Sequence, residues 1–219
     1  MNSYTMKNYS KLLLIIIFFN VSAAFANDEK YIAAMQKNID ALYKAQDPAA
    51  IQNVVNALDR IAAAEKTKWE PQYYIGYGYV MMAFRESDKV KKDSYLDLSL
   101  AAINKGKELL PNDSEFAALE GFVHMIRVTV DPPTRGPQFG RLSMEMFEKS
   151  LALNPENPRA LALKAQMQYG TAKFFGQSTT EACTTLNASL TKFETFKSEN
   201  VLAPTWGKIM ADGMKEDCK

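Results

Sequence analysis

The fold is decided by the stretch Pro71-Gln-Tyr-Tyr-Ile-Gly-Tyr-Gly78 and by three later stretches that repeat its pattern. These are Ser114-Glu-Phe-Ala-Ala-Leu-Glu-Gly121, Pro158-Arg-Ala-Leu-Ala-Leu-Lys-Ala165 and Pro204-Thr-Trp-Gly-Lys-Ile-Met-Ala211. Each opens with a proline or serine suited to a helix start and has glycine or alanine seven positions later. The starts lie 43, 44 and 46 residues apart. A unit that recurs at this spacing predicts a solenoid in which each helix pair buries its apolar face on its neighbours.

A second signature lies between these stretches. The pattern Ser99-x3-Ile103-x2-Gly106-x4-Pro111 returns as Ser143-x3-Phe147-x2-Ser150-x4-Pro155. Small residues let two helix backbones approach, the bulky residue fills the gap between them, and the proline ends the second helix of the pair. The signature therefore predicts the second helix of each unit.

A further helix pair is predicted upstream of the repeats. Apolar residues recur at three- and four-residue spacing from Tyr31 to Tyr43 and again from Ile51 to Ile61. The break between them reads Asp47-Pro48, a capping residue followed by proline at a first helical position. Two helices with so short a link form an antiparallel hairpin.

These residues resemble the tetratricopeptide repeat over roughly residues 28–219. The small residue of the first helix, the small-bulky-small spacing of the second and the terminal proline all match, although each unit is about ten residues longer than the family's roughly 34. The resemblance implies an all-α, right-handed superhelix of about nine helices built from α-α hairpins. The runs 69–74, 157–159, 174–177 and 204–207 are also similar to small exported proteins of Bacteroidetes.

Residues 1–26 have the composition of a secretory signal peptide. A positive start with Lys7 and Lys11 precedes an apolar run, and Ala-Phe-Ala at 24–26 offers a cleavage site. The alternative is a retained membrane anchor, but about ten apolar residues are far fewer than the roughly 20 needed to cross a bilayer. We expect a signal peptide at 1–26, a repeat domain at 27–219 without a membrane span, and export to the periplasm.

The charge of the chain argues against nucleic acid and anionic lipid as general partners. The whole chain has a formal charge of +1, and the signal segment holds two lysines and no acid, which leaves −1 for the rest. A nearly neutral protein has no bulk electrostatic attraction to polyanions.

The two cysteines are predicted to form a disulfide. Export to an oxidising compartment favours pairing, and no CxxC motif is present. Cys183 lies near the start of one predicted helix and Cys218 at the end of the next, so antiparallel packing would bring them together. The weaker alternative is a redox role.

No residue pattern points to catalysis or to a cofactor. His124 is the only histidine and lies among apolar neighbours, and Glu120 is the only acid or cysteine three or four residues away, which is too few ligands for a metal site. There is no glycine-rich phosphate loop. We therefore expect no enzyme activity, no cofactor and no metal.

The resemblance implies a concave groove, lined by first helices, as one candidate binding surface. Carried over unit by unit, its residues are Gln72, Tyr79, Met82, Glu115, Phe122, Met125, Arg159, Gln166 and Tyr169. Aromatic, methionine and arginine side chains suit interfaces. The alternative is that Phe122 and the two methionines belong to the core.

The segments between first and second helices are the other candidate. They run over 85–92, 131–141 and 171–179, and repetition places them on one edge of the array. Their candidate binding residues are Arg135, Phe139, Arg141, Lys173 and Phe174. Such residues could clamp an anionic or extended ligand, or the phenylalanines could simply plug helix ends.

Two functions follow from these surfaces. The first is a scaffold or adaptor that binds another envelope protein or peptide through the groove. The second is a carrier that binds a small or polymeric ligand through the inserts.

Overall fold

The structure, a computed structural model, describes residues 28–218, and this part of the chain is helical without a strand. The proposed signal peptide and Lys219 lie outside the described residues. A first helix spans residues 28–44. It is followed by α2 (Pro48–Ala64), α3 (Glu70–Arg85), α4 (Lys89–Leu109), α5 (Ser114–Val128), α6 (Pro132–Arg135), α7 (Arg141–Leu153), α8 (Pro158–Phe174), α9 (Thr180–Thr195) and α10 (Lys208–Gly213).

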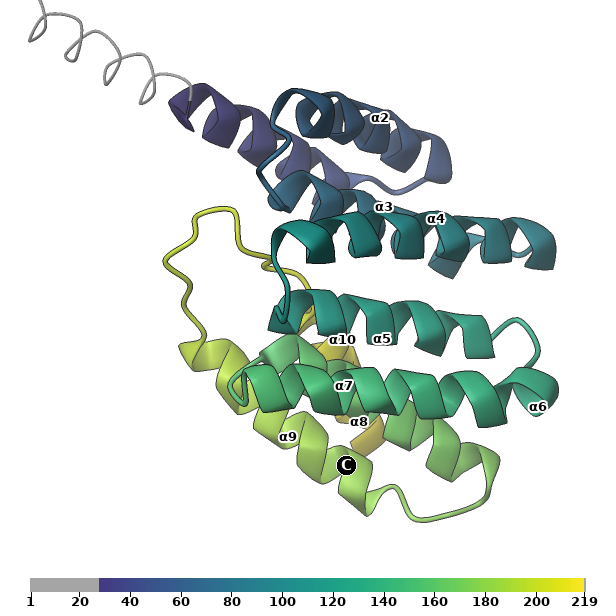
Figure 1. Cartoon of the computed structure of the whole chain (residues 1–219). Coiled ribbons are helices and arrows are strands. Elements are labelled where there is room, and N and C mark those ends of the chain that lie inside the picture. The colour runs from purple at the N-terminus through teal and green to yellow at the C-terminus, as the bar shows by residue number, and fades with distance from the viewer. Residues whose placement is uncertain (1–27, 219) are drawn as a thin grey trace, which may run out of the picture.

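The helices stack as antiparallel pairs, as Figure 1 shows. The pairs are the 28–44 helix with α2, α3 with α4, α5 with α7, and α8 with α9, and α4 contacts α5 while α7 contacts α8. Each pair therefore covers the apolar face of the next. The predicted all-α architecture is confirmed.

Four helices begin at the capping residues that the sequence places there. The side chains of Asp47, Asp88, Asp113 and Asn157 each accept a hydrogen bond from a backbone N–H in the first turn of the helix that follows. Such caps satisfy backbone donors that have no partner inside the helix. They fix where α2, α4, α5 and α8 start.

The repeated serines of the second helices bond to glycine carbonyls of the first helices. The Ser99 hydroxyl donates to the Gly76 carbonyl at 2.8 Å, and Ser143 donates to Gly121 at 2.9 Å in the next unit. The two bonds require close backbones, because a Cβ on Gly121 would lie 2.4 Å from the buried Phe147 ring. The small-bulky-small signature is thus a packing device between paired helices.

The predicted inserts are shorter than the sequence suggested, because helices take up most of their residues. Helix α4 is 21 residues long and begins at Lys89, which leaves three residues after α3. The segment 131–141 forms α6 and a π-helical turn, Gly136–Gly140, that leads into α7. The extra length of each unit therefore lies mainly in longer helices.

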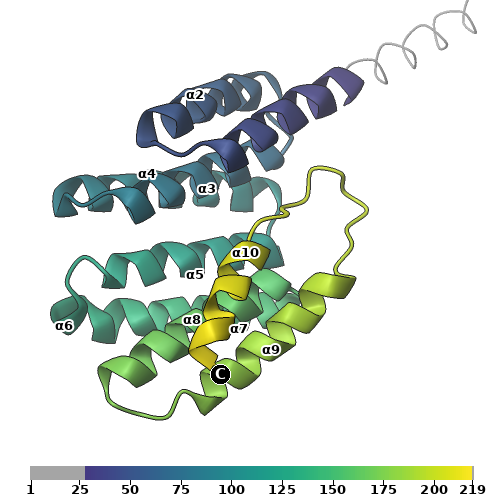
Figure 2. The ribbon, with the colours of Figure 1, turned by 180° about the vertical axis from the view of Figure 1, so that it is seen from behind.

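The prediction that Pro204 opens a fourth repeat is wrong. Residues 204–206 are not helical, Gly207 has a φ of 104°, and α10 begins only at Lys208. A side chain at Gly207 would be strained by this φ and would also meet Arg159 Cγ at 2.9 Å. Residues 196–218, which we call the C-terminal arm, instead turn back across the helical stack (Figure 2).

A disulfide fastens the end of the arm. Cys183, in the first turns of α9, is bonded to Cys218, and their Cα atoms are 5.4 Å apart. The predicted pairing is confirmed. It closes a loop with a sequence separation of 35 and holds the last residues of the arm against α9.

No helix among residues 28–218 is long and apolar enough to cross a bilayer.

The glycine contacts generate a first prediction. Gly121→Ala should lower the free energy of unfolding by roughly 1–3 kcal/mol, because the new methyl group overlaps a fully buried ring. Gly170→Ala is the matched control: it lies in α8 with nothing within 4 Å, so it should be neutral or stabilise by up to about 1 kcal/mol. Urea unfolding measures both, and equal effects would contradict the packing argument.

The disulfide generates a second prediction. Replacing both cysteines by serine should lower stability by roughly 3–4 kcal/mol, the chain-entropy value for a loop of this length. Thermal unfolding with and without a reductant checks it. The double variant should not respond to reductant, whereas an oxidised wild type that is equally unresponsive would show that the bond contributes nothing.

Candidate functional site beneath the C-terminal arm

The arm is held to the first helix of the second pair by buried hydrogen bonds. The Tyr74 hydroxyl donates to the Leu202 carbonyl at 2.7 Å, and the Trp206 indole N–H donates to the Tyr73 hydroxyl at 3.0 Å. All four residues are buried. Buried polar groups stabilise a fold only when they are paired, and these pairs join segments about 130 residues apart.

Trp206 fills the space over α3 and α5. Its ring stacks on Tyr77 with centroids 5.0 Å apart and on Phe122 with centroids 5.9 Å apart. Stacked aromatic pairs at these distances add to the gain from burial. The tryptophan therefore fixes the position of the arm on the stack.

An ion pair supports the base of the arm. Arg159 is 1% exposed and donates Nε and Nη2 to the two Glu115 carboxylate oxygens at 2.7 and 2.6 Å. Its guanidinium also lies over the Phe196 ring, 4.6 Å from the centroid. Burial opposes the charge, but the bonds and charge of Glu115 outweigh it and raise the pKa of Arg159. The Arg159 guanidinium is therefore already paired with Glu115 and Phe196 inside the protein.

Between the arm, α3 and the first helix lies a cleft of about 250 Å³, which we call the arm cleft. Its walls come from the end of the 28–44 helix, the second half of α3 and the start of α10. The lining residues are Leu42, Tyr43, Tyr77, Met81, Arg85, Thr205, Trp206, Gly207, Lys208, Ile209 and Met210. A second void beneath the arm, beside Gln166 and Met214, measures about 10 Å³ and has room for one water at most.

The arm cleft is apolar and aromatic with a few polar groups. The Tyr43 ring meets the Tyr77 ring edge to face at 5.9 Å, and the Tyr43 hydroxyl accepts the Thr205 N–H at 3.2 Å. Burial and the neighbouring Tyr43 raise the pKa of Tyr77, whereas the charge of Arg85 acts in the opposite direction. Such walls suit a flat, mostly apolar molecule.

The structure places the predicted groove residues in different surroundings. Phe122 packs on Trp206, and Met82 and Met125 are buried in the core, at 2% and 8% exposure. Tyr79 stacks on Tyr95 of α4. Tyr169 packs against a small apolar cluster under α10 that includes Leu186, Ala211 and Met214. Gln72 is half-buried. The nine residues do not form one open groove, since the arm occupies the middle of this face.

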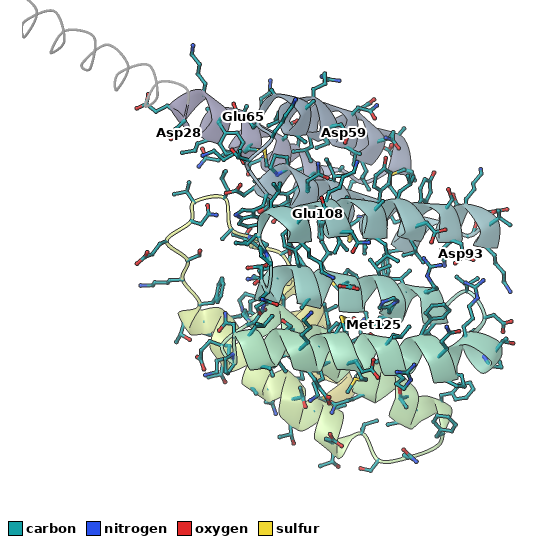
Figure 3. The ribbon with its side chains drawn as sticks, viewed as in Figure 1. Asp28, Asp59, Glu65, Asp93, Glu108 and Met125 are labelled. Atoms are coloured by element: carbon teal, nitrogen blue, oxygen red, sulfur yellow. A yellow bond between two sulfur atoms is a disulfide. The ribbon has the colours of Figure 1, made fainter. Side chains whose placement is uncertain are left out.

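The predicted insert residues also make internal contacts. Arg135 donates two hydrogen bonds to Asp93, at 2.7 and 2.8 Å. Asp93 lies near the start of α4 and is labelled in Figure 3. Phe139 stacks on His124, and Arg141 pairs with Glu145. These three residues therefore contact side chains of α4, α5 and α7.

The last insert differs, because its aromatic side chains face solvent. Phe174 and Phe175 are 60% and 66% exposed and meet edge to face at 5.1 Å. Lys173 lies 6.0 Å from the Tyr169 ring. Neither Phe174 nor Phe175 lines the arm cleft or the small void beneath the arm.

His124 has structural surroundings. Its ring is half-buried against Phe139, and burial is the main cause that lowers its pKa. Over residues 28–218 no cluster of histidine, cysteine and acidic residues could hold a metal ion.

Most residues that line the arm cleft are not among the candidate binding residues predicted from the sequence. Tyr77 and Met81 lie on the same helix as the predicted Tyr79 and Met82 but on another face of it. The repeat pattern places the arm residues in a helix, although Gly207 within that run is a residue type that commonly marks turns.

The chain matches no known family model and no curated protein sequence. Among solved structures it is similar to the HusA haemophore from Porphyromonas gingivalis, with a TM-score of 0.77 and 27% sequence identity. The match covers 86% of this chain and 92% of the haemophore. The resemblance therefore extends over nearly the whole helical fold.

Proposed function

We propose that the protein is a carrier of a planar, largely apolar ligand of the haem class, bound in the arm cleft. The likeness to a haemophore supports the carrier alternative over the protein scaffold that the sequence favoured. The proposed site differs from the inserts that the sequence put forward for such a carrier.

The observation behind the proposal is the character of the cleft walls. Tyr43, Tyr77 and Trp206 supply aromatic rings, and Met81, Met210 and Leu42 supply flexible apolar contacts. Ile209, which also lines the cleft, is 88% exposed. A large apolar side chain left in solvent beside an aromatic cleft gains free energy when a flat apolar ligand covers it.

The size of the cleft restricts how such a ligand would bind. Its volume of about 250 Å³ is just below the roughly 300–1,000 Å³ common for ligand pockets. A tetrapyrrole would therefore insert part of its ring between the aromatic walls and leave one edge at the rim. That edge is where its carboxylates would remain solvated.

The rest of the sequence prediction completes the proposal. Residues 1–26 would be a signal peptide and residues 27–219 an exported, periplasmic helical-repeat domain of the tetratricopeptide type. The disulfide supports an oxidising compartment.

Titration with iron protoporphyrin IX tests the proposal. We expect saturable quenching of tryptophan fluorescence, because Trp206 lines the cleft, together with a shift of the Soret band. Ile209→Ser should weaken binding about fivefold or more, since it removes apolar surface that the ligand buries, without changing stability.

Val201→Ser is the matched control. Val201 belongs to the same arm, is 65% exposed and does not line the cleft, so this variant should bind like the wild type. Absence of saturable binding, or equal losses in both variants, would refute the proposed site.

A further inference from the structure

The charges at the arm cleft are all of one sign. Its lining includes the cations Arg85 and Lys208 and no carboxylate. Cations at the rim of an otherwise apolar cleft suit a ligand that combines an apolar body with an acidic edge.

Lys208 is already paired within the protein. Its ammonium lies 2.9 Å from a Glu194 carboxylate oxygen and 3.4 Å from one of Asp212. A ligand carboxylate would have to compete with two acids for this one charge. Lys208 therefore contributes less net attraction than its position suggests.

Arg85 has no such partner among the residues that the structure describes. It is the last residue of α3, is exposed, and donates Nη1 to the Met81 carbonyl at 3.1 Å. A cation at a helix C-terminus is favourable in itself. The bond to Met81 uses one of five guanidinium N–H donors, and the others remain for a planar anion.

We propose that Arg85 is the residue that recognises a carboxylate of the ligand, so that the cleft selects acid-bearing tetrapyrroles over their neutral esters. This inference rests on the proposed function, because it assumes a ligand between the aromatic walls. Arg85 lies on α3 across the cleft from the arm, so the ion pair would orient the acidic edge of the ligand toward the end of α3. Guanidinium and carboxylate form paired, directional hydrogen bonds, which suits such an orienting role.

A ligand pair that differs only in charge tests the inference. Wild type, Arg85→Gln and Arg60→Gln are each titrated with iron protoporphyrin IX and with its dimethyl ester, in the same non-ionic detergent. Arg60 is an exposed arginine on α2 away from the cleft, so its variant controls for the change in net charge.

The expected result is a loss confined to one variant and one ligand. Arg85→Gln should bind the free acid about three- to fivefold more weakly, the range for an exposed ion pair, and bind the ester like the wild type. The preference of the wild type for the acid should shrink as salt is raised. Arg60→Gln should match the wild type with both ligands.

Other outcomes separate the two proposals. If the wild type binds neither ligand, the haem-class carrier itself is refuted. If both ligands bind but Arg85→Gln weakens them equally, or weakens neither, the carboxylate contact is refuted and the carrier stands. A larger acid-specific loss in Lys208→Gln than in Arg85→Gln would also overturn the assignment.

Discussion

The insertion of Trp206 between Tyr77 and Phe122 is the interaction on which the rest of this structure depends. A tandem array of helix pairs leaves the face lined by its first helices open, and here one residue of the chain's own end fills it. The indole N–H finds its partner in Tyr73, so the ring enters the core without leaving an unpaired donor. The remaining contacts of the arm are arranged around this ring.

Closing the face in this way converts an open groove into a bounded cleft. Leu202 of the arm lies beside Tyr74, and the chain turns at Gly207, directly after Trp206. It then forms α10, which lies against α8 and α9. Where the arm turns away from α3, the space between them stays unfilled and becomes the arm cleft. The C-terminal arm, which the repeat pattern predicts to be part of another helix pair, supplies one wall of this cleft instead.

The sequence predicted the helical pairs well because their signals are local. The Asp47-Pro48 cap and the repeated serine and glycine positions act within one pair, so spacing along the chain reveals them. The disulfide was predictable because it requires only that two neighbouring segments run in opposite directions, with one cysteine at the start of the first and one at the end of the second.

The arm and its cleft could not be predicted in the same way. The bond between Tyr74 and Leu202 joins residues 128 positions apart, and no local pattern encodes it. Pro204 resembles a helix start because proline suits the first helical position, but proline also occurs in extended segments and turns. The groove residues Tyr79 and Met82 follow from the alignment with the repeat family, which has no counterpart of the arm that makes Tyr77 and Met81 line a cleft.

The fastening of the arm also bears on how the site can bind. The arm is anchored at two places. Leu202 and Trp206 are hydrogen-bonded to tyrosines of α3, and Cys218 is disulfide-bonded to α9. Ile209, which lies between these anchors, projects into solvent. A wall fixed at both ends loses little conformational entropy when a ligand settles against it, so more of the contact energy remains as affinity. The packing that stabilises the arm and the preorganisation of the cleft thus have the same origin.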